Sequence, residues 1–350
     1  MSPTRAVLCG YYGMGNAGDE ALLVSLLQML PKSVEPIVLS GNPQDTKKSY
    51  GVYSCDRKST FALLKILQQS DVFIWGGGSL MQDATSIASP IYYGGLMALA
   101  QQRGLKTIAW AQGIGPLNKS FTRWMTQQVL LGCNGISVRD NASAELLRSW
   151  QIEPVIAPDP VWAMENEVPP DLPNTDKPIV AVVLRSHYLL TKAQLQILIQ
   201  AINDFQTQSD SFILLIPFQP QQDRAIAEQI SARLQQNRAI MSVPNPKQLK
   251  GLFKSVKMAI GMRLHSLIMA ASEGCSCFAI SYDPKVTQLM SELNLSGYEL
   301  KDLPQDPEII TAAWLEHLEE QRAIEPIKIK SLIDRALIHQ QLLKQVIINN

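Results

Sequence analysis

The stretch AVLCGYYGMGNAGDEALL, residues 6–23, decides the fold of the first half of the chain. Four apolar residues precede the spacing Gly13-x-Gly15-x-x-Gly18, and an apolar segment with helical spacing follows it. A buried strand, a glycine turn and a helix in that order are typical of a doubly wound α/β domain. The stretch therefore predicts such a domain, with a ligand site at the carboxyl end of its first strand.

The same glycine spacing occurs in NAD-binding turns, but this turn differs from them. Asp19 and Glu20 place negative charge where a pyrophosphate would bind. The next strand ends at Ser40-Gly41-Asn42, without the acid that would bind the ribose, and no P-loop Lys-Ser or Lys-Thr pair follows the glycines. The two acids either cap the helix or bind sugar hydroxyls, with one of them acting as a base. We favour the second interpretation.

Composition limits the classes of function. The chain has 350 residues, 46% of them hydrophobic and 18% charged, which is enough for two domains with cores of their own. Its 31 basic residues balance 31 acidic residues, which argues against a nucleic-acid partner. No apolar run reaches the ~20 residues of a membrane span, no signal peptide is visible, and five cysteines lack a C-x-x-C pair, so we expect a cytoplasmic protein. The four histidines lack metal-binding spacing, so we expect neither a metal nor a cofactor.

Apolar runs and helix-length segments alternate along the chain. The first half predicts strands at 5–10, 35–40, 72–75, 106–111, 135–138 and 155–157, and helices at 18–30, 58–69, 90–103, 119–132 and 141–150. The second half predicts strands at 178–185, 211–218, 239–243, 257–262 and 277–282, with helical segments between them. This rhythm indicates two doubly wound Rossmann-like domains.

Four prolines in the segment 165–178 predict a linker between these domains. We expect a first domain over 1–165, a second over 178–326, and one helix over 327–350. The basic residues of that helix leave open a peripheral contact with the inner face of the cell membrane. We favour packing of the helix back onto the first domain.

Two further strands of the first half also end in glycine and polar side chains. Consecutive glycines at a strand end are costly unless the backbone must approach something closely. We therefore predict that these two loops bind the same polar ligand as the opening turn. Their candidate binding residues are Gly77, Gly78, Ser79, Gln82 and Asp83 in the first loop, and Gln112 and Gly113 in the second.

Strand ends of the second half carry basic groups instead. Arg185 follows one predicted strand, Arg263 and His265 follow another, and Lys285 follows a third. Arg139 lies at a similar strand end in the first half. Arginine forks and helix N-termini hold phosphate or carboxylate well, so these residues predict an anion site.

Six motifs, taken in order, resemble those of polysaccharide pyruvyl transferases, and in particular the cell-surface-anchoring CsaB-type enzymes. The resemblance covers the chain from about residue 10 to about residue 285, and the region after Asn294 carries nothing that matches. The motifs are GYYGMGNAGDEAL (10–22), GGGSLMQDATS (76–86), AQGIGP (111–116), VRD (138–140), DPV (159–161) and GMRLHSLI (261–268).

The resemblance implies a fold similar to GT-B glycosyltransferases, with the active site in a cleft between the two domains. It implies phosphoenolpyruvate as donor and a sugar or lipid-linked oligosaccharide as acceptor, which gains a pyruvate ketal while phosphate is released. Arg263, Leu264 and His265 match the family motif for donor binding and catalysis. The glycine–acid loop corresponds to Asn16, Gly18, Asp19 and Glu20.

Two other functions remain open on the sequence. A GT-B glycosyltransferase with a nucleotide sugar would share the architecture, and Glu273 is the acid that would bind its nucleotide. A sugar-binding protein of polysaccharide assembly without catalysis would keep the fold. The presence of both Arg263-x-His265 and Asp19-Glu20 favours a catalytic protein over a sugar-binding protein without catalysis.

Overall fold

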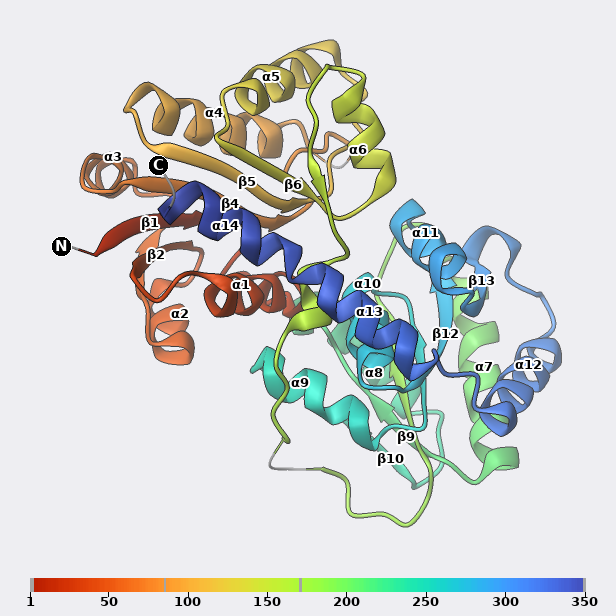
Figure 1. Cartoon of the computed structure of the whole chain (residues 1–350). Helices are drawn as coiled ribbons and strands as arrows, with labels where there is room; N and C mark the ends of the chain where they lie inside the picture. Colours follow the sequence, from red (N-terminus) through yellow and green to blue (C-terminus); the bar gives the residue numbers. More distant parts are fainter. Residues whose placement is uncertain (1–2, 85, 170–171, 349–350) are drawn as a thin grey trace. The chain divides into compact units, whose positions relative to one another are not determined.

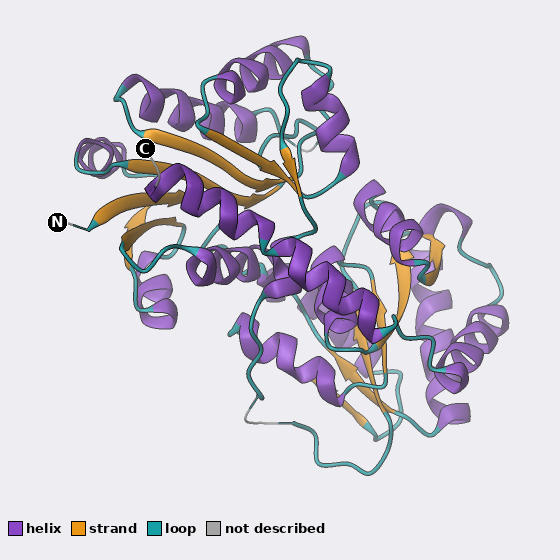
Figure 2. Cartoon of the chain, in the orientation of Figure 1, coloured by secondary structure: helices purple, strands orange, loops and turns teal. Residues whose placement is uncertain are grey.

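The structure is a computed structural model that describes residues 3–84, 86–169 and 172–348 (Figure 1). The chain divides into two compact units, residues 1–164 with 331–350 and residues 165–330. Each unit is built around one parallel β-sheet with helices on both faces (Figure 2). The predicted pair of doubly wound α/β domains is confirmed. Within the predicted linker, residues 170 and 171 lie outside the described residues, as does Thr85 of the second motif.

The first unit has a seven-stranded sheet of order β3-β2-β1-β4-β5-β6-β7. Its strands are β1 (Thr4–Cys9), β2 (Val34–Ser40), β3 (Tyr53–Asp56), β4 (Val72–Gly78), β5 (Lys106–Gln112), β6 (Gly135–Val138) and β7 (Val155–Ile156). Its helices are α1 (Ala17–Met29), α2 (Pro43–Tyr50), α3 (Thr60–Gln68), α4 (Ala88–Gln102), α5 (Ser120–Leu131), α6 (Asn141–Arg148), the short η1 (Pro160–Ala163) and, from the end of the chain, α14 (Ile338–Ile348).

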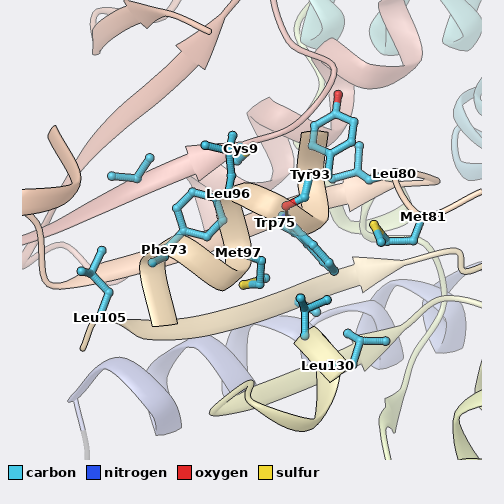
Figure 3. Packing of buried hydrophobic residues seen from close by; sticks show 14 of the residues in the cluster. Cys9, Phe73, Trp75, Leu80, Met81, Tyr93, Leu96, Met97, Leu105 and Leu130 are labelled. Carbon is cyan, nitrogen blue, oxygen red and sulfur yellow. Dashed lines mark hydrogen bonds between the residues drawn. The ribbon is translucent and has the colours of Figure 1, made fainter. Parts of the chain in front are cut away.

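Two hydrophobic layers cover this sheet. On one face Phe73 and Trp75 of β4 pack with Leu96 and Met97 of α4, together with residues of α3, α5 and α6 (Figure 3). On the other face, side chains of α1 and α14 pack on β1, β4 and β5, and Leu343 of α14 is fully buried there. The last helix of the chain is thus part of the core of the first unit.

Three segments differ from the sequence-based expectation. The helix α2 and the edge strand β3 were not predicted, because α2 is almost entirely polar and only Cys55 of β3 is buried. The tail forms two helices, α13 (Pro326–Ala336) and α14, with a break at Leu337. Their apolar spacing continues through the break, so the sequence alone predicts one helix.

The second unit has a six-stranded sheet of order β10-β9-β8-β11-β12-β13. Its strands are β8 (Ile179–Val183), β9 (Phe212–Leu215), β10 (Arg238–Ile240), β11 (Met258–Gly261), β12 (Ser276–Ser281) and β13 (Ser296–Glu299). Its helices are α7 (Lys192–Ser209), α8 (Pro220–Ser231), α9 (Pro246–Leu252), α10 (Leu264–Ser272), α11 (Pro284–Leu293), α12 (Pro307–Glu320) and the short η2 (Phe253–Ser255) and η3 (Leu300–Asp302). The strand β13 was not predicted, because its four residues are mostly polar and contain no apolar run.

The strand order determines which loops of each sheet can form a ligand site. In the first unit the chain runs outward from β1 to β2 and β3, then returns to β4 beside β1 and continues in the opposite direction. In the second unit β8 and β11 have the same relationship. Ligands of open α/β sheets bind at the carboxyl ends of the strands at this switch point. The loops after β1 and β4, and those after β8 and β11, therefore carry the candidate sites.

Candidate active site

The loop after β1 is closed by the first turn of α1. The Asn16 side chain caps the helix by accepting a hydrogen bond from the Gly18 N–H at 3.1 Å. Glu20 reaches back, and its Oε1 accepts the N–H of Gly13 at 2.7 Å while its Oε2 accepts the Tyr50 hydroxyl at 2.8 Å. Both carboxylate oxygens of Glu20 are thus engaged in holding the loop.

Burial raises the pKa of Glu20, and the nearby Asp19 adds to the rise, although the hydrogen bonds from Tyr50 and Gly13 oppose it. Folding therefore removes the Glu20 carboxylate from water and leaves it with two fixed donors. Such a group suits the structure of the loop better than proton transfer to a ligand.

Asp19 lies in the same helix turn as Glu20. A Cβ placed on Gly78 would lie 3.5 Å from Asp19 Oδ1, so the carboxylate faces the glycines that end β4. Gly77 and Gly78 have φ of +81° and +89°, a conformation that favours glycine. The loops after β1 and β4 therefore meet at the switch point, with Asp19 between them.

A buried ion pair organises the neighbouring strand ends. Arg139 Nη1 lies 2.6 Å from Asp159 Oδ2, and both side chains are almost fully buried. Arg139 Nη2 donates to Ser79 Oγ at 3.1 Å, and a Cβ on Gly113 would be tightly placed, 3.1 Å from Ser79 Oγ and 3.2 Å from Arg139 Nε. Ser79, Gly113 and Arg139 thus lie close together, and Asp159 holds Nη1 of Arg139.

The end of β5 contains a local irregularity. Ala111 has φ of +49°, and the pairing of β5 with β6 shifts register between Ala109 and Gln112. Gln112 is fully buried, its Nε2 donates to the Trp110 carbonyl, and its Oε1 receives no hydrogen bond from the described residues. A buried acceptor without a donor costs free energy, and such groups occur at functional sites.

Asp83 has a structural explanation. Its carboxylate accepts hydrogen bonds from the N–H groups of Asn118 and Lys119 and from the Thr122 hydroxyl, which closes the first turn of α5. Desolvation acts to raise the pKa of Asp83, but these hydrogen bonds outweigh it and hold the pKa below its usual value. Gln82 accepts from the Ala84 N–H in the same loop. Asp83 is better explained as a cap of α5 than as a substrate ligand.

In the second unit, basic and aromatic side chains follow β8 and β12. Arg185 Nη1 donates to the Tyr282 hydroxyl at 2.7 Å, and its guanidinium lies 5.0 Å from the centroid of the same ring. The His187 ring contacts Tyr282 in a tilted arrangement, with ring centroids 4.5 Å apart. Burial and the charge of Arg185 lower the pKa of His187, although Asp283 opposes the shift. The half-buried Arg185 is thus held in place by an aromatic ring.

The buried side chain of Arg263 is oriented by Asp223. Its Nε and Nη2 donate to the two carboxylate oxygens at 2.9 and 2.8 Å, and Gln219 Oε1 lies 3.5 Å from Nη2. Among the described residues, none accepts a hydrogen bond from Nη1. Asp223 therefore occupies Nε and Nη2 of the predicted fork.

The N-terminus of α10 lies directly after Arg263. Arg263 supplies no side-chain hydrogen bond to the first turn of the helix, which begins with the half-buried Leu264 and His265. By contrast, Asp283 caps α11 by accepting the Lys285 N–H at 2.9 Å. The first N–H groups of α10 and its positive dipole end therefore face the carboxyl edge of the sheet.

The sequence matches the polysaccharide pyruvyl transferase family over residues 16–284, which is more than half of the chain. The chain belongs to this family. The matched segment contains the loops after β4, β8 and β11, and it begins at Asn16, the last residue of the loop after β1. No curated protein matches the sequence closely enough to count as a relative.

Several solved structures have a similar fold. UDP-GlcNAc 2-epimerase from Neisseria meningitidis has a TM-score of 0.64 at 11% identity, with 97% of this chain and 100% of that one covered. A glycosyltransferase from Rickettsia africae has a TM-score of 0.56 at 13% identity, covering 99% of both chains. MurG from Acinetobacter baumannii has a TM-score of 0.54 at 13% identity, covering 98% and 100%. At this identity the likeness shows the fold alone, and the predicted GT-B-like architecture of this pyruvyl transferase family member is confirmed.

Several residues of the site escaped the sequence-based prediction. Asp223 and Tyr50 lie in helices whose polar residues look like solvent-exposed ones in the sequence. His187 did carry a signal, since Arg185-x-His187 repeats the spacing of Arg263-x-His265, and the two follow neighbouring strands. Glu273 lies at the opposite end of α10, where Lys250, Lys254 and Asn166 surround its carboxylate.

Two properties of the described residues concern metals and membranes. Within residues 3–84, 86–169 and 172–348, no three His, Cys, Asp or Glu side chains gather closely enough to hold a metal ion. No helix in the described part of the chain combines the length and apolar content that crossing a bilayer requires.

Proposed function

We propose that this family member transfers the pyruvyl group of phosphoenolpyruvate to two hydroxyls of a sugar, forming a ketal and releasing phosphate. The acceptor is a sugar or lipid-linked oligosaccharide of cell-surface polysaccharide synthesis, as in the CsaB-type enzymes. One observation carries the proposal: the two switch points hold complementary chemistry. The loops after β1 and β4 present Asp19, whereas the loops after β8 and β11 present Arg185, Arg263 and His265.

The second unit is suited to the donor. Phosphoenolpyruvate carries a carboxylate and a phosphate, so it needs two cationic holders. Arg185 is fixed by Tyr282, and Arg263 is fixed by Asp223 with Nη1 left over. The N-terminus of α10 adds its positive dipole end. We assign the donor anion to these three groups.

His265 is the proposed general acid, at the second position of α10. It donates a proton to the methylene carbon of phosphoenolpyruvate, which makes C2 electrophilic, and the first sugar hydroxyl adds to C2. The second hydroxyl then forms its bond to C2 while the C2–O bond to phosphate breaks. Of the two hydroxyl protons, one replaces the proton that His265 gave and the other leaves with phosphate. The atoms and charges therefore balance. These steps need no metal and no cofactor besides the co-substrate.

Asp19 is the proposed base, because its carboxylate lies at the carboxyl end of β4, whereas both oxygens of Glu20 hold the loop after β1. The Asp19 carboxylate faces Gly78, where the missing side chain leaves room for a ligand. The buried Oε1 of Gln112 is a second acceptor for a sugar hydroxyl. Carboxylate and amide oxygens accept hydrogen bonds from hydroxyls, which supports the first unit as the acceptor side.

Phosphate release from phosphoenolpyruvate tests the proposal. The protein is incubated with phosphoenolpyruvate and a panel of methyl hexosides, methyl N-acetylhexosaminides and lipid-linked disaccharides, and each product is weighed by mass spectrometry. We expect acceptor-dependent phosphate release and an acceptor that gains a pyruvyl ketal. Absence of phosphoenolpyruvate binding by calorimetry, together with transfer of a hexose from a nucleotide sugar, would establish the glycosyltransferase alternative instead.

A further inference from the structure

His339 connects the end of the chain to the candidate site of the first unit. It is the second residue of α14, it is fully buried, and its ring packs edge-on against Trp110 with centroids 5.6 Å apart. The Trp110 indole N–H donates to the His339 carbonyl at 3.2 Å. Neither the family motifs nor the proposed reaction gives this histidine a role.

Its ring nitrogens have one consistent hydrogen-bond arrangement. The Pro158 carbonyl lies 3.0 Å from Nε2 and can only accept, so Nε2 carries the hydrogen. Burial lowers the pKa of His339 to about 4, so its ring is neutral near pH 7. Nδ1 then carries no hydrogen and accepts from the Ser137 hydroxyl, whose Oγ lies 2.9 Å away and itself accepts the Ala111 N–H at 2.9 Å.

Each nitrogen leads to a different part of the site. Through Ser137, Nδ1 supports the N–H of Ala111, the residue with φ of +49° that directs Gln112 and Gly113. Through Pro158, Nε2 holds the residue before Asp159.

Asp159 in turn fixes Arg139, which donates to Ser79. The two branches end on the loops after β4 and β5. Both loops belong to the proposed acceptor side.

We propose that His339 is a positioning residue for the acceptor side, which makes the C-terminal helix α14 part of the catalytic apparatus. The expected effect of His339 on catalysis rests on the proposed function. The other claim, that His339 holds Ala111 through Ser137, can be tested without measuring enzyme activity.

The chain contains a matched control. His317 is also buried, and its Nε2 lies 2.8 Å from Ser276 Oγ, which makes a second histidine–serine pair. Ser276 is the first residue of β12, so this pair lies at the amino end of the second sheet, away from the proposed donor site. Truncation of His317 removes a comparable buried ring without touching either switch point.

The test compares His339→Ala, His339→Gln and His317→Ala in the full chain. A displacement of reacting groups by about 1 Å can lower the rate about a hundredfold. We therefore expect His339→Ala to lower kcat/KM for the acceptor by about 10- to 100-fold, while the KM for the donor stays unchanged. His339→Gln keeps an N–H that can reach the Pro158 carbonyl and should recover part of the loss. His317→Ala should lower the unfolding midpoint but leave kcat/KM within about twofold.

Amide hydrogen exchange gives the independent readout. We expect faster exchange at residues 111–114 in His339→Ala, and no change there in His317→Ala, whether or not phosphoenolpyruvate is the donor. If the wild-type protein transfers no pyruvyl group, the proposed function is refuted. The exchange rates at residues 111–114 still decide whether His339 positions this loop. Unchanged exchange at 111–114, or equal loss of kcat/KM in the two Ala variants, would overturn the inference.

Discussion

Asp223 binds two nitrogens of the Arg263 guanidinium, Nε at 2.9 Å and Nη2 at 2.8 Å, in the interior of the second unit. Asp223 has no exposed surface, and it also accepts the Gln219 N–H at 2.8 Å. Arg263 therefore enters the proposed donor site already oriented, with Nη1 as its remaining donor. Its contribution to anion binding depends on a carboxylate that the sequence motif does not contain.

Removal of this carboxylate should impair both stability and donor binding. Breaking a buried ion pair costs about 3–5 kcal/mol, so Asp223→Ala should unfold at much lower urea concentration. Asp223→Asn is milder and should raise the dissociation constant for phosphoenolpyruvate about tenfold, because Arg263 loses its fixed orientation. The control is Arg185→Ala, which should weaken donor binding by a similar factor while leaving the urea midpoint nearly unchanged. Calorimetry showing unchanged donor affinity in Asp223→Asn would contradict the orientation.

Asp19 and Glu20 should respond differently to amide substitution. Glutamine at position 20 can accept from the Gly13 N–H and donate to the Tyr50 hydroxyl, so Glu20→Gln should retain turnover within about threefold. Asp19→Asn removes the proposed base and should lower kcat by about 10²–10⁴-fold with the fold intact. Steady-state kinetics with circular dichroism checks both. Equal activity in the two variants would show that Asp19 is not the base.

A methyl group on Gly78 should lower activity by more than its effect on stability explains. Alanine in the left-handed region costs about 1–2 kcal/mol at either Gly78 or Gly104, whose φ are +89° and +76°. A methyl group on Gly78 would also lie 3.5 Å from Asp19 Oδ1, whereas one on Gly104 meets nothing within 4 Å. We expect similar losses of thermal stability, but a fall in acceptor kcat/KM for Gly78→Ala only. Similar kinetics in both would place the acceptor elsewhere.

His339 should make the free energy of unfolding depend on pH. Burial lowers its pKa from 6.5 to about 4, and the nearby charges of Asp159 and Arg139 act in opposite directions. The unfolded chain therefore takes up a proton below about pH 6.5 that the folded protein does not, so stability falls as the pH drops toward 4. At pH 5 the protonation of His339 in the unfolded chain lowers the free energy of unfolding by about 2 kcal/mol relative to neutral pH.

Urea unfolding at pH 7.5 and pH 5 measures the effect. The wild type should lose more stability between the two pH values than His339→Gln, which has no group that titrates there. The same loss in both proteins would mean that other groups, such as the buried His317, carry the dependence.

Local sequence was sufficient for most of the fold. The run before Gly10 and the periodic segment after Gly18 define β1 and α1, and similar runs define most other buried strands. The strands β3 (YSCD) and β13 (SGYE) were missed because they are short and mostly polar, without an apolar run. The edge strands β7 and β10 are also only half-buried, but their apolar residues marked them in the sequence.

The site was predictable to the level of strand ends, but not to the level of side-chain partners. Topology alone places Asp19 and Arg263 at switch points. The partners come from distant segments: Tyr50 lies 30 residues from Glu20, and Asp223 lies 40 residues from Arg263. One sequence carries no record of which distant residues meet. For this reason Asp83 was predicted to bind substrate although it holds α5.

The most direct test of the central claim is the fate of phosphoenolpyruvate in deuterium oxide. The wild type and His265→Gln are incubated with phosphoenolpyruvate and the acceptor panel, and phosphate and the pyruvyl methyl group are followed by NMR. We predict one phosphate released per ketal formed, one solvent deuteron in each methyl group, and neither product with His265→Gln. A ketal whose methyl group contains no deuterium, or turnover of nucleotide sugars without consumption of phosphoenolpyruvate, would contradict the account.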